Sequence, residues 1–190
     1  MEQQTSGQPW WLLTVYGGMI SLIGILLFRF LEGGQPSIGY WIGALMMVSG
    51  GCALWFGVAS LRSERIGSWL ILAGLISTAL GVAMLVYADG SVRSFTDLIG
   101  YWALLFTFLQ TGQAMYSYLG PGFGLDYLGK LIHVLLAILS GVLAFTLIMW
   151  PESPGNPLKL IGLLPVAMGG LLIALTLRLR NKDKLAMSAS

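Results

Sequence analysis

The segment 131–151, LIHVLLAILSGVLAFTLIMWP, runs for 21 residues without an Asp, Glu, Lys or Arg. An α-helix needs roughly 20 mainly apolar residues to cross the hydrocarbon core of a bilayer. Five further charge-free windows of 18 to 29 residues occur at 3–28, 33–61, 66–88, 98–125 and 160–177. The six windows together cover 145 of the 190 residues. The sequence therefore predicts an all-α, polytopic membrane protein with six transmembrane helices in a single membrane domain.

The bulk composition excludes several other classes of protein. Only 9% of the residues are charged, whereas soluble domains carry roughly 25%. The single cysteine, Cys52, rules out an intramolecular disulfide, and the single histidine, His133, rules out a histidine cluster for a metal or haem. The net charge of +2 gives no sign of nucleic-acid binding. We expect no cofactor other than bound lipids, and no nucleic-acid partner.

Glycine and proline clusters separate the windows and set the predicted helix bounds. We place the helices at about 10–31, 38–61, 66–87, 98–119, 128–150 and 158–179. Most tryptophans lie near the ends of these helices, where their amphipathic rings favour the headgroup region; these are Trp10, Trp11, Trp41, Trp69, Trp102 and Trp150. Trp55 lies deeper.

The distribution of basic residues predicts the orientation, because cationic loops stay cytoplasmic. Six crossings put both termini on one side, together with seven basic residues: Arg62, Arg65, Lys130, Arg178, Arg180, Lys182 and Lys184. The other side has three: Arg29, Arg93 and Lys159. Both termini should therefore face the cytoplasm. The basic residues of the tail 178–190 serve as a topology signal or contact anionic lipid headgroups.

An internal repeat divides the chain into three parts. The motif Ile-Gly-Tyr-Trp occurs at 38–41 and again at 99–102, and a weaker copy, Ile-Gly-Leu-Leu, occurs at 161–164. Each copy lies near the start of an even-numbered predicted helix. The spacing predicts three tandem two-helix hairpins at about 10–62, 66–119 and 128–180.

The sequence resembles the HdeD family of small bacterial membrane proteins. The resemblance is carried by the start Trp10-Trp11-Leu12-Leu13, glycine-rich helices, short Pro/Gly turns and the exit Arg178-Leu179-Arg180. It implies six spans built from three hairpins, a bacterial inner-membrane location and an association with acid resistance and other stress. It implies no catalytic residues. The third repeat departs from the pattern, because its aromatic pair is absent and Pro165 should interrupt the last helix.

The best site candidate is a polar face inside the fourth predicted span. Gln110 and Gln113 are three residues apart and share one helical face, which Thr107 and Thr111 flank. These amides either form interhelical hydrogen bonds or contact a polar substrate or lipid headgroup. His133, about one turn inside the fifth span, is a candidate pH-sensitive residue because imidazole titrates at roughly pH 6.5. The alternative is an ordinary interfacial histidine with one hydrogen-bond partner.

Small residues recur at four-residue spacing along several predicted helices. Such stripes let helix backbones approach closely in a bilayer, where van der Waals contact holds helices together. We expect this packing role, rather than a cofactor channel, for Gly17, Ser21, Gly39, Gly43, Ser77, Gly81 and Gly141.

The polar face and the resemblance lead to three functional hypotheses. The first is a non-enzymatic, stress-associated inner-membrane protein of the HdeD type, acting by structural, lipid or protein interactions, alone or as a homo-oligomer. The second is an accessory subunit of a larger membrane protein complex. The third is a small transporter or channel that uses the Gln110/Gln113 face.

Overall fold

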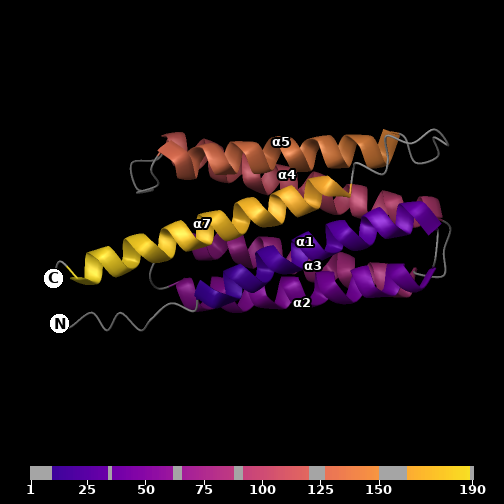
Figure 1. Cartoon of the computed structure of the whole chain (residues 1–190), viewed down its shortest axis with the longest axis horizontal. Coiled ribbons are helices and arrows are strands. Elements are labelled where there is room, and N and C mark those ends of the chain that lie inside the picture. The colour runs from indigo at the N-terminus through magenta and orange to yellow at the C-terminus, as the bar shows by residue number, and fades with distance from the viewer. Residues whose placement is uncertain are drawn as a thin grey trace.

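The computed structural model describes residues 10–33, 36–61, 66–87, 92–119, 127–149 and 162–188. These residues form six α-helices and no strand, so the predicted all-α fold is confirmed for this part of the chain. The helices are α1 (Trp10–Gly33), α2 (Pro36–Ser60), α3 (Ile66–Val86), α4 (Val92–Leu119), α5 (Tyr127–Met149) and α7 (Leu163–Ser188). They lie alongside one another in one elongated bundle (Figure 1).

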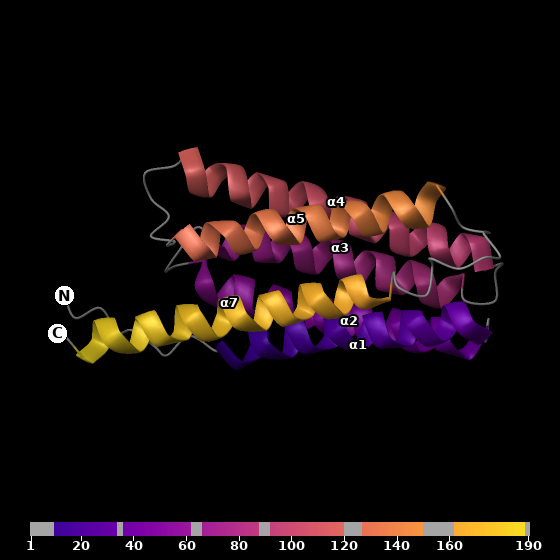
Figure 2. The same cartoon turned by 45° about the horizontal axis from the view of Figure 1, so that its top comes forward.

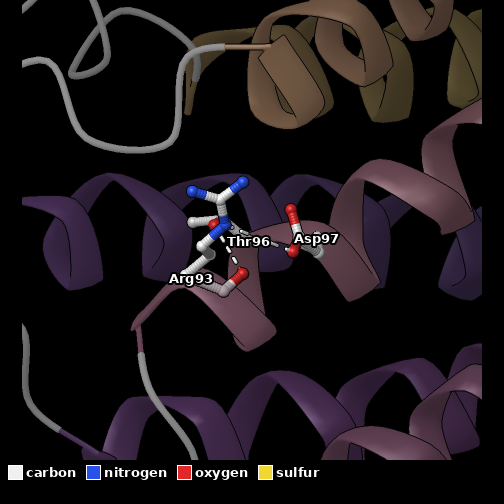
Figure 3. A network of polar contacts seen from close by, with 3 residues as sticks. All are labelled: Arg93, Thr96 and Asp97. Atoms are coloured by element: carbon white, nitrogen blue, oxygen red, sulfur yellow. Dashed lines mark hydrogen bonds and ion pairs between the residues drawn. The ribbon is translucent and has the colours of Figure 1, made fainter.

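Five of these helices are long and apolar enough to cross a membrane: α1, α2, α3, α5 and α7. The exception is α4, which begins at Val92, six residues before its predicted start, and so includes Arg93 and Asp97. Figure 3 shows how its first turns are held: the Thr96 hydroxyl donates to the Arg93 carbonyl at 2.9 Å, and Arg93 Nε lies 4.0 Å from Asp97 Oδ2. Helix α4 therefore extends beyond the charge-free window and includes these contacts in its first turns.

The helices form a closed ring in which each packs against two neighbours. The order is α1, α2, α3, α4, α5, α7 and back to α1 (Figures 1 and 2). The most extensive contacts are α2 with α3, α4 with α5, and α1 with α7. Each of these pairs joins the end of one predicted hairpin to the start of the next, with α7 returning to α1. The assignment of three tandem repeats remains a prediction.

Facing glycines bring the backbones of two helix pairs into contact. On α2 and α3 they recur every seven residues, about two helical turns, as Gly43 with Gly81, Gly50 with Gly74, and Gly57 with Gly67. A Cβ atom added at Gly74 would lie 2.7 Å from the carbonyl oxygen of Gly50. Such a separation is too short for non-bonded carbon and oxygen. The same pattern joins α1 to α7, as Gly17 with Gly169 and Gly24 with Gly162, the residue just before α7.

The pair α4–α5 is held by side chains instead. The hydroxyls of Thr107 and Ser140 lie 2.9 Å apart and form a hydrogen bond across this pair. Gly100 faces the side chain of Ile148, and Gly141 faces Thr107 at ordinary contact distance. Polar side chains therefore contribute directly to the contact between these two helices.

Trp102 corrects one prediction. It is only 1% exposed rather than interfacial, its Nε1–H donates to the Ser77 hydroxyl at 3.1 Å, and its ring stacks on Phe106. Trp41, at the same place in the other copy of the motif, is 66% exposed. The two identical tetrapeptides therefore occupy different environments, because Trp102 faces Ser77 of α3 inside the bundle, whereas Trp41 lies on the outer surface.

The last helix also differs from its predicted bounds. It begins at Leu163 and continues to Ser188, well past the predicted end at 179. Pro165 does not interrupt it, because it lies in the first turn, where a missing N–H breaks no helical hydrogen bond. Arg178 and Arg180 are thus on the helix itself. The side chains of Lys182 and Lys184 lie outside the described residues, and lipid contact by this group remains a prediction.

The glycine contacts predict a sharp contrast between adjacent positions. Gly50→Ala should lower the free energy of unfolding by about 1–3 kcal/mol, because the new methyl group would overlap the Gly74 carbonyl and Thr78. Gly51→Ala should be neutral or stabilise by up to about 1 kcal/mol, because its methyl group would meet no atom within 4 Å. Denaturant titration in mixed micelles measures both, and equal effects would contradict the proposed packing.

Candidate functional site

A cavity of about 60 Å³ lies inside the ring. Five helices contribute to its lining, and α2 does not; the residues are Leu13, Tyr16, Trp69, Leu70, Ala73, Phe106, Leu109, Gln110, Gln113, His133, Leu172, Leu175, Thr176 and Leu179. On α1, α3 and α5 these residues follow the helix start, and on α4 they belong to the second half. The cavity therefore lies toward the end of the bundle where α1 begins and α7 ends (Figure 1).

Gln110 of α4 and His133 of α5 form a hydrogen bond within this lining. His133 Nδ1 lies 2.8 Å from Gln110 Oε1, and Gln110 is 6% exposed. An amide oxygen only accepts, so the imidazole donates from Nδ1. In the neutral ring, Nε2 then keeps a free lone pair, and the Gln110 amide keeps two N–H donors. The pair therefore offers both a donor and an acceptor beyond its own bond.

Three further polar residues line the cavity: Tyr16, Gln113 and Thr176. The Tyr16 side chain is 2% exposed, and its hydroxyl has no hydrogen-bond partner among the described residues. Ser77 is a neighbour of this hydroxyl; it accepts a hydrogen bond from Trp102 and keeps a second lone pair and its own O–H donor. Gln113 is half-buried. Thr176 differs from them, because its hydroxyl donates to the Leu172 carbonyl of its own helix at 2.8 Å.

Buried side chains form the inner end, or floor, of the cavity. Tyr16, Ala73 and Phe106 are buried, whereas Trp69 and Gln113 are half-buried and closer to the helix ends. The Trp69 ring covers Gly112, where an added Cβ would lie 3.0 Å from the ring. Access is therefore through the rim, near the end that carries the termini.

The predicted polar face is divided by the structure. Gln110 and Gln113 both line the cavity, while Thr107 points to Ser140 at the helix interface. Thr111 is exposed on the outer surface, which corrects its place on the face. The reason is helix geometry: one residue rotates the side chain by about 100°, so Thr111 turns away from the side that Gln110 faces.

The remaining predicted residues lie at helix contacts rather than in the cavity. Gly17, Gly43 and Gly81 are at the close backbone approaches, and Gly39 faces the Phe95 ring. The Ser21 hydroxyl reaches the Val166 carbonyl of α7 at 3.4 Å. Tyr16 and Trp69 are cavity residues that sequence reasoning missed. Of these two residues, only Tyr16 had a sequence feature that could have pointed to the site, because it is a polar aromatic residue inside a charge-free window.

No protein family, curated protein or solved structure gives a significant match to this chain. The part of the chain that the structure describes holds no group of three or more His, Cys, Asp or Glu side chains placed to bind a metal ion. The site is thus a mainly apolar cavity with an amide–imidazole pair and a buried phenol on its wall.

The amide–imidazole bond predicts a measurable coupling between α4 and α5. Gln110→Leu should destabilise the protein by about 1–3 kcal/mol, because it leaves a buried imidazole N–H without its acceptor. His133→Leu added to Gln110→Leu should recover part of this loss. Denaturation of the two single variants and the double variant gives a coupling energy, expected at about 0.5–1.5 kcal/mol.

The neighbouring substitution Thr111→Val is the control for this cycle. Its side chain is exposed, so it should change the free energy of unfolding by less than about 0.5 kcal/mol. A coupling energy of zero between positions 110 and 133 would contradict the bond.

Proposed function

We propose that this chain is an integral membrane protein in which all six helices cross the bilayer, with both ends in the cytoplasm. It is a non-enzymatic, stress-associated protein of the HdeD type in the bacterial inner membrane. It acts by binding lipids or protein partners through its helix faces.

The observation that carries this proposal is the apolar outer surface of the ring. Large apolar side chains are exposed on every helix, including Trp11 and Ile25 on α1, Trp41 and Trp55 on α2, Leu75 and Val82 on α3, Phe108 and Met115 on α4, Ile138 and Phe145 on α5, and Leu177 on α7. Monomeric soluble proteins rarely expose contiguous apolar surface of this kind. A surface of this kind is suited to contact with lipid chains.

The length of α4 supports a sixth crossing. Its 28 residues span about 42 Å at 1.5 Å per residue, which is more than the roughly 30 Å of the hydrocarbon core. The excess accommodates Arg93 and Asp97 at the headgroup level, and leaves the segment from Leu98 onward for the membrane. Phe108 on its outer face is 67% exposed, as expected for a lipid contact.

The HdeD assignment is supported by the start Trp10-Trp11-Leu12-Leu13 and the exit Arg178-Leu179-Arg180. Both motifs lie at the same end of the bundle, on α1 and α7, which pack together. The association with stress follows from this resemblance.

The transporter or channel hypothesis is favoured by the cavity itself, since Gln110 and Gln113 both line it. Buried apolar side chains occupy the bundle beyond the floor, among them Ile99, Trp102 and Leu143. Passage along the ring would therefore require these side chains to separate, whereas binding at one end would not. The geometry thus supports binding ahead of transport.

Labelling of single cysteines tests the sixth crossing. In a Cys52→Ala background, Ser94→Cys and Tyr118→Cys place thiols at exposed positions in the first and last parts of α4. An impermeant maleimide should label position 94 only from the periplasmic side and position 118 only from the cytoplasmic side. Labelling of both from one side would mean that α4 does not cross.

Native mass spectrometry after gentle extraction from the native membrane tests the mode of action. We expect a monomer or small homo-oligomer that carries only lipid, and slower growth of a deletion strain at low pH. Stoichiometric recovery of other subunits would favour the accessory-subunit hypothesis instead.

A further inference from the structure

We propose that the cavity binds a small neutral molecule with an apolar body and a single hydroxyl group, such as a short-chain alcohol. The site goes beyond interaction through the outer helix faces. It depends on the interior of the ring and not on the number of crossings, so each proposal can fail alone.

The size of the cavity limits the ligand. A buried water needs a cavity volume of roughly 10–15 Å³, and this cavity has a volume of about 60 Å³. It therefore has room for about four to six atoms of the size of a water oxygen. A chain of four carbons with one hydroxyl has five non-hydrogen atoms and fits this range.

The charge of the lining selects a neutral ligand. No Asp, Glu, Lys or Arg is among the fourteen lining residues. An ion would be desolvated there without a countercharge, which is costly. Leu13, Ala73, Phe106 and Leu172 instead provide an apolar surface for a hydrocarbon body.

The polar groups select a hydroxyl. Tyr16 lines the cavity. Its buried hydroxyl, next to Ser77, has no hydrogen bond within the distance limit among the described residues, and such a group costs free energy until it is hydrogen-bonded. Gln110 retains amide donors, and His133 retains an acceptor at Nε2, because their mutual bond uses only Oε1 and Nδ1. A ligand hydroxyl both donates and accepts, so it complements this set where a hydrocarbon cannot.

The position of the cavity suits reversible binding. It lies between the pair α4–α5 and the other helices, and α4 and α5 have their thinnest contacts with α3 and α7. At the contact between α3 and α4, the Trp69 ring packs against Gly112. Small movements of the α4–α5 pair can therefore admit a ligand without breaking the glycine contacts.

A titration with 1-butanol tests the proposal, with 1-chlorobutane as the ligand of equal size that lacks a hydroxyl. The readout is the methyl resonance of Ala73 in methyl-labelled full-length protein in nanodiscs. Ala79, which is exposed on the outer surface of the same helix, reports general partition into the lipid. We expect saturable shifts at Ala73 alone, with roughly three- to tenfold weaker binding of 1-chlorobutane.

Two variants identify the hydrogen-bonding groups. Tyr16→Phe and Gln110→Leu should each weaken 1-butanol binding roughly three- to tenfold without a matching loss for 1-chlorobutane. Tyr16→Phe should fold normally, because the lost hydroxyl has no partner among the described residues. Thr111→Val, outside the cavity, should bind as the original chain does.

Three results would overturn the proposal. These are parallel, non-saturating shifts at Ala73 and Ala79, equal affinity for the two ligands in the original chain, or a preference for 1-butanol that survives both cavity variants. The ligand comparison in the original chain decides the matter even if Gln110→Leu fails to fold.

Discussion

The whole bundle depends on direct contact between helix backbones at glycine. Lipid tails are as apolar as the helices, so burial of apolar surface gives helices in a bilayer little reason to associate. The helices must instead be held together by close approach and van der Waals contact. The pairs α2–α3 and α1–α7 meet this constraint with glycines that face one another every two turns. Because α1 and α7 are the first and last helices, their contact also closes the ring.

The third pair meets the same constraint in a different way, and its polar side chains reach the site. Between α4 and α5 the contacts are hydroxyls and an amide–imidazole pair, with Thr107 against Ser140 and Gln110 against His133. The cavity lies beside Gln110, between this pair and the other helices, where α4 and α5 have their thinnest contacts, with α3 and α7.

The helices themselves could be predicted from the sequence, because a charge-free window of membrane length leaves few alternatives to a helix. Gln110 and Gln113, which the sequence places on one helical face, both line the cavity. The features that could not be predicted depend on the rotation of a helix about its axis and on contacts with residues far away in the sequence. The burial of Trp102 depends on Ser77 of a different helix, and the exposure of Thr111 depends on the rotation of α4. The contact between Ser21 and Val166 joins positions 145 residues apart, which no local pattern specifies.

Closure of the ring by α1 and α7 is the central claim, and disulfide formation in native membranes tests it most directly. Ser21 and Val166 face each other across this pair, so Ser21→Cys with Val166→Cys, in a Cys52→Ala background, should cross-link rapidly under mild oxidation. The control pair is Leu22→Cys with Val166→Cys, because Leu22 is exposed on the outer surface, and it should remain reduced. Equal cross-linking of the two pairs, or none in either, would contradict a closed ring.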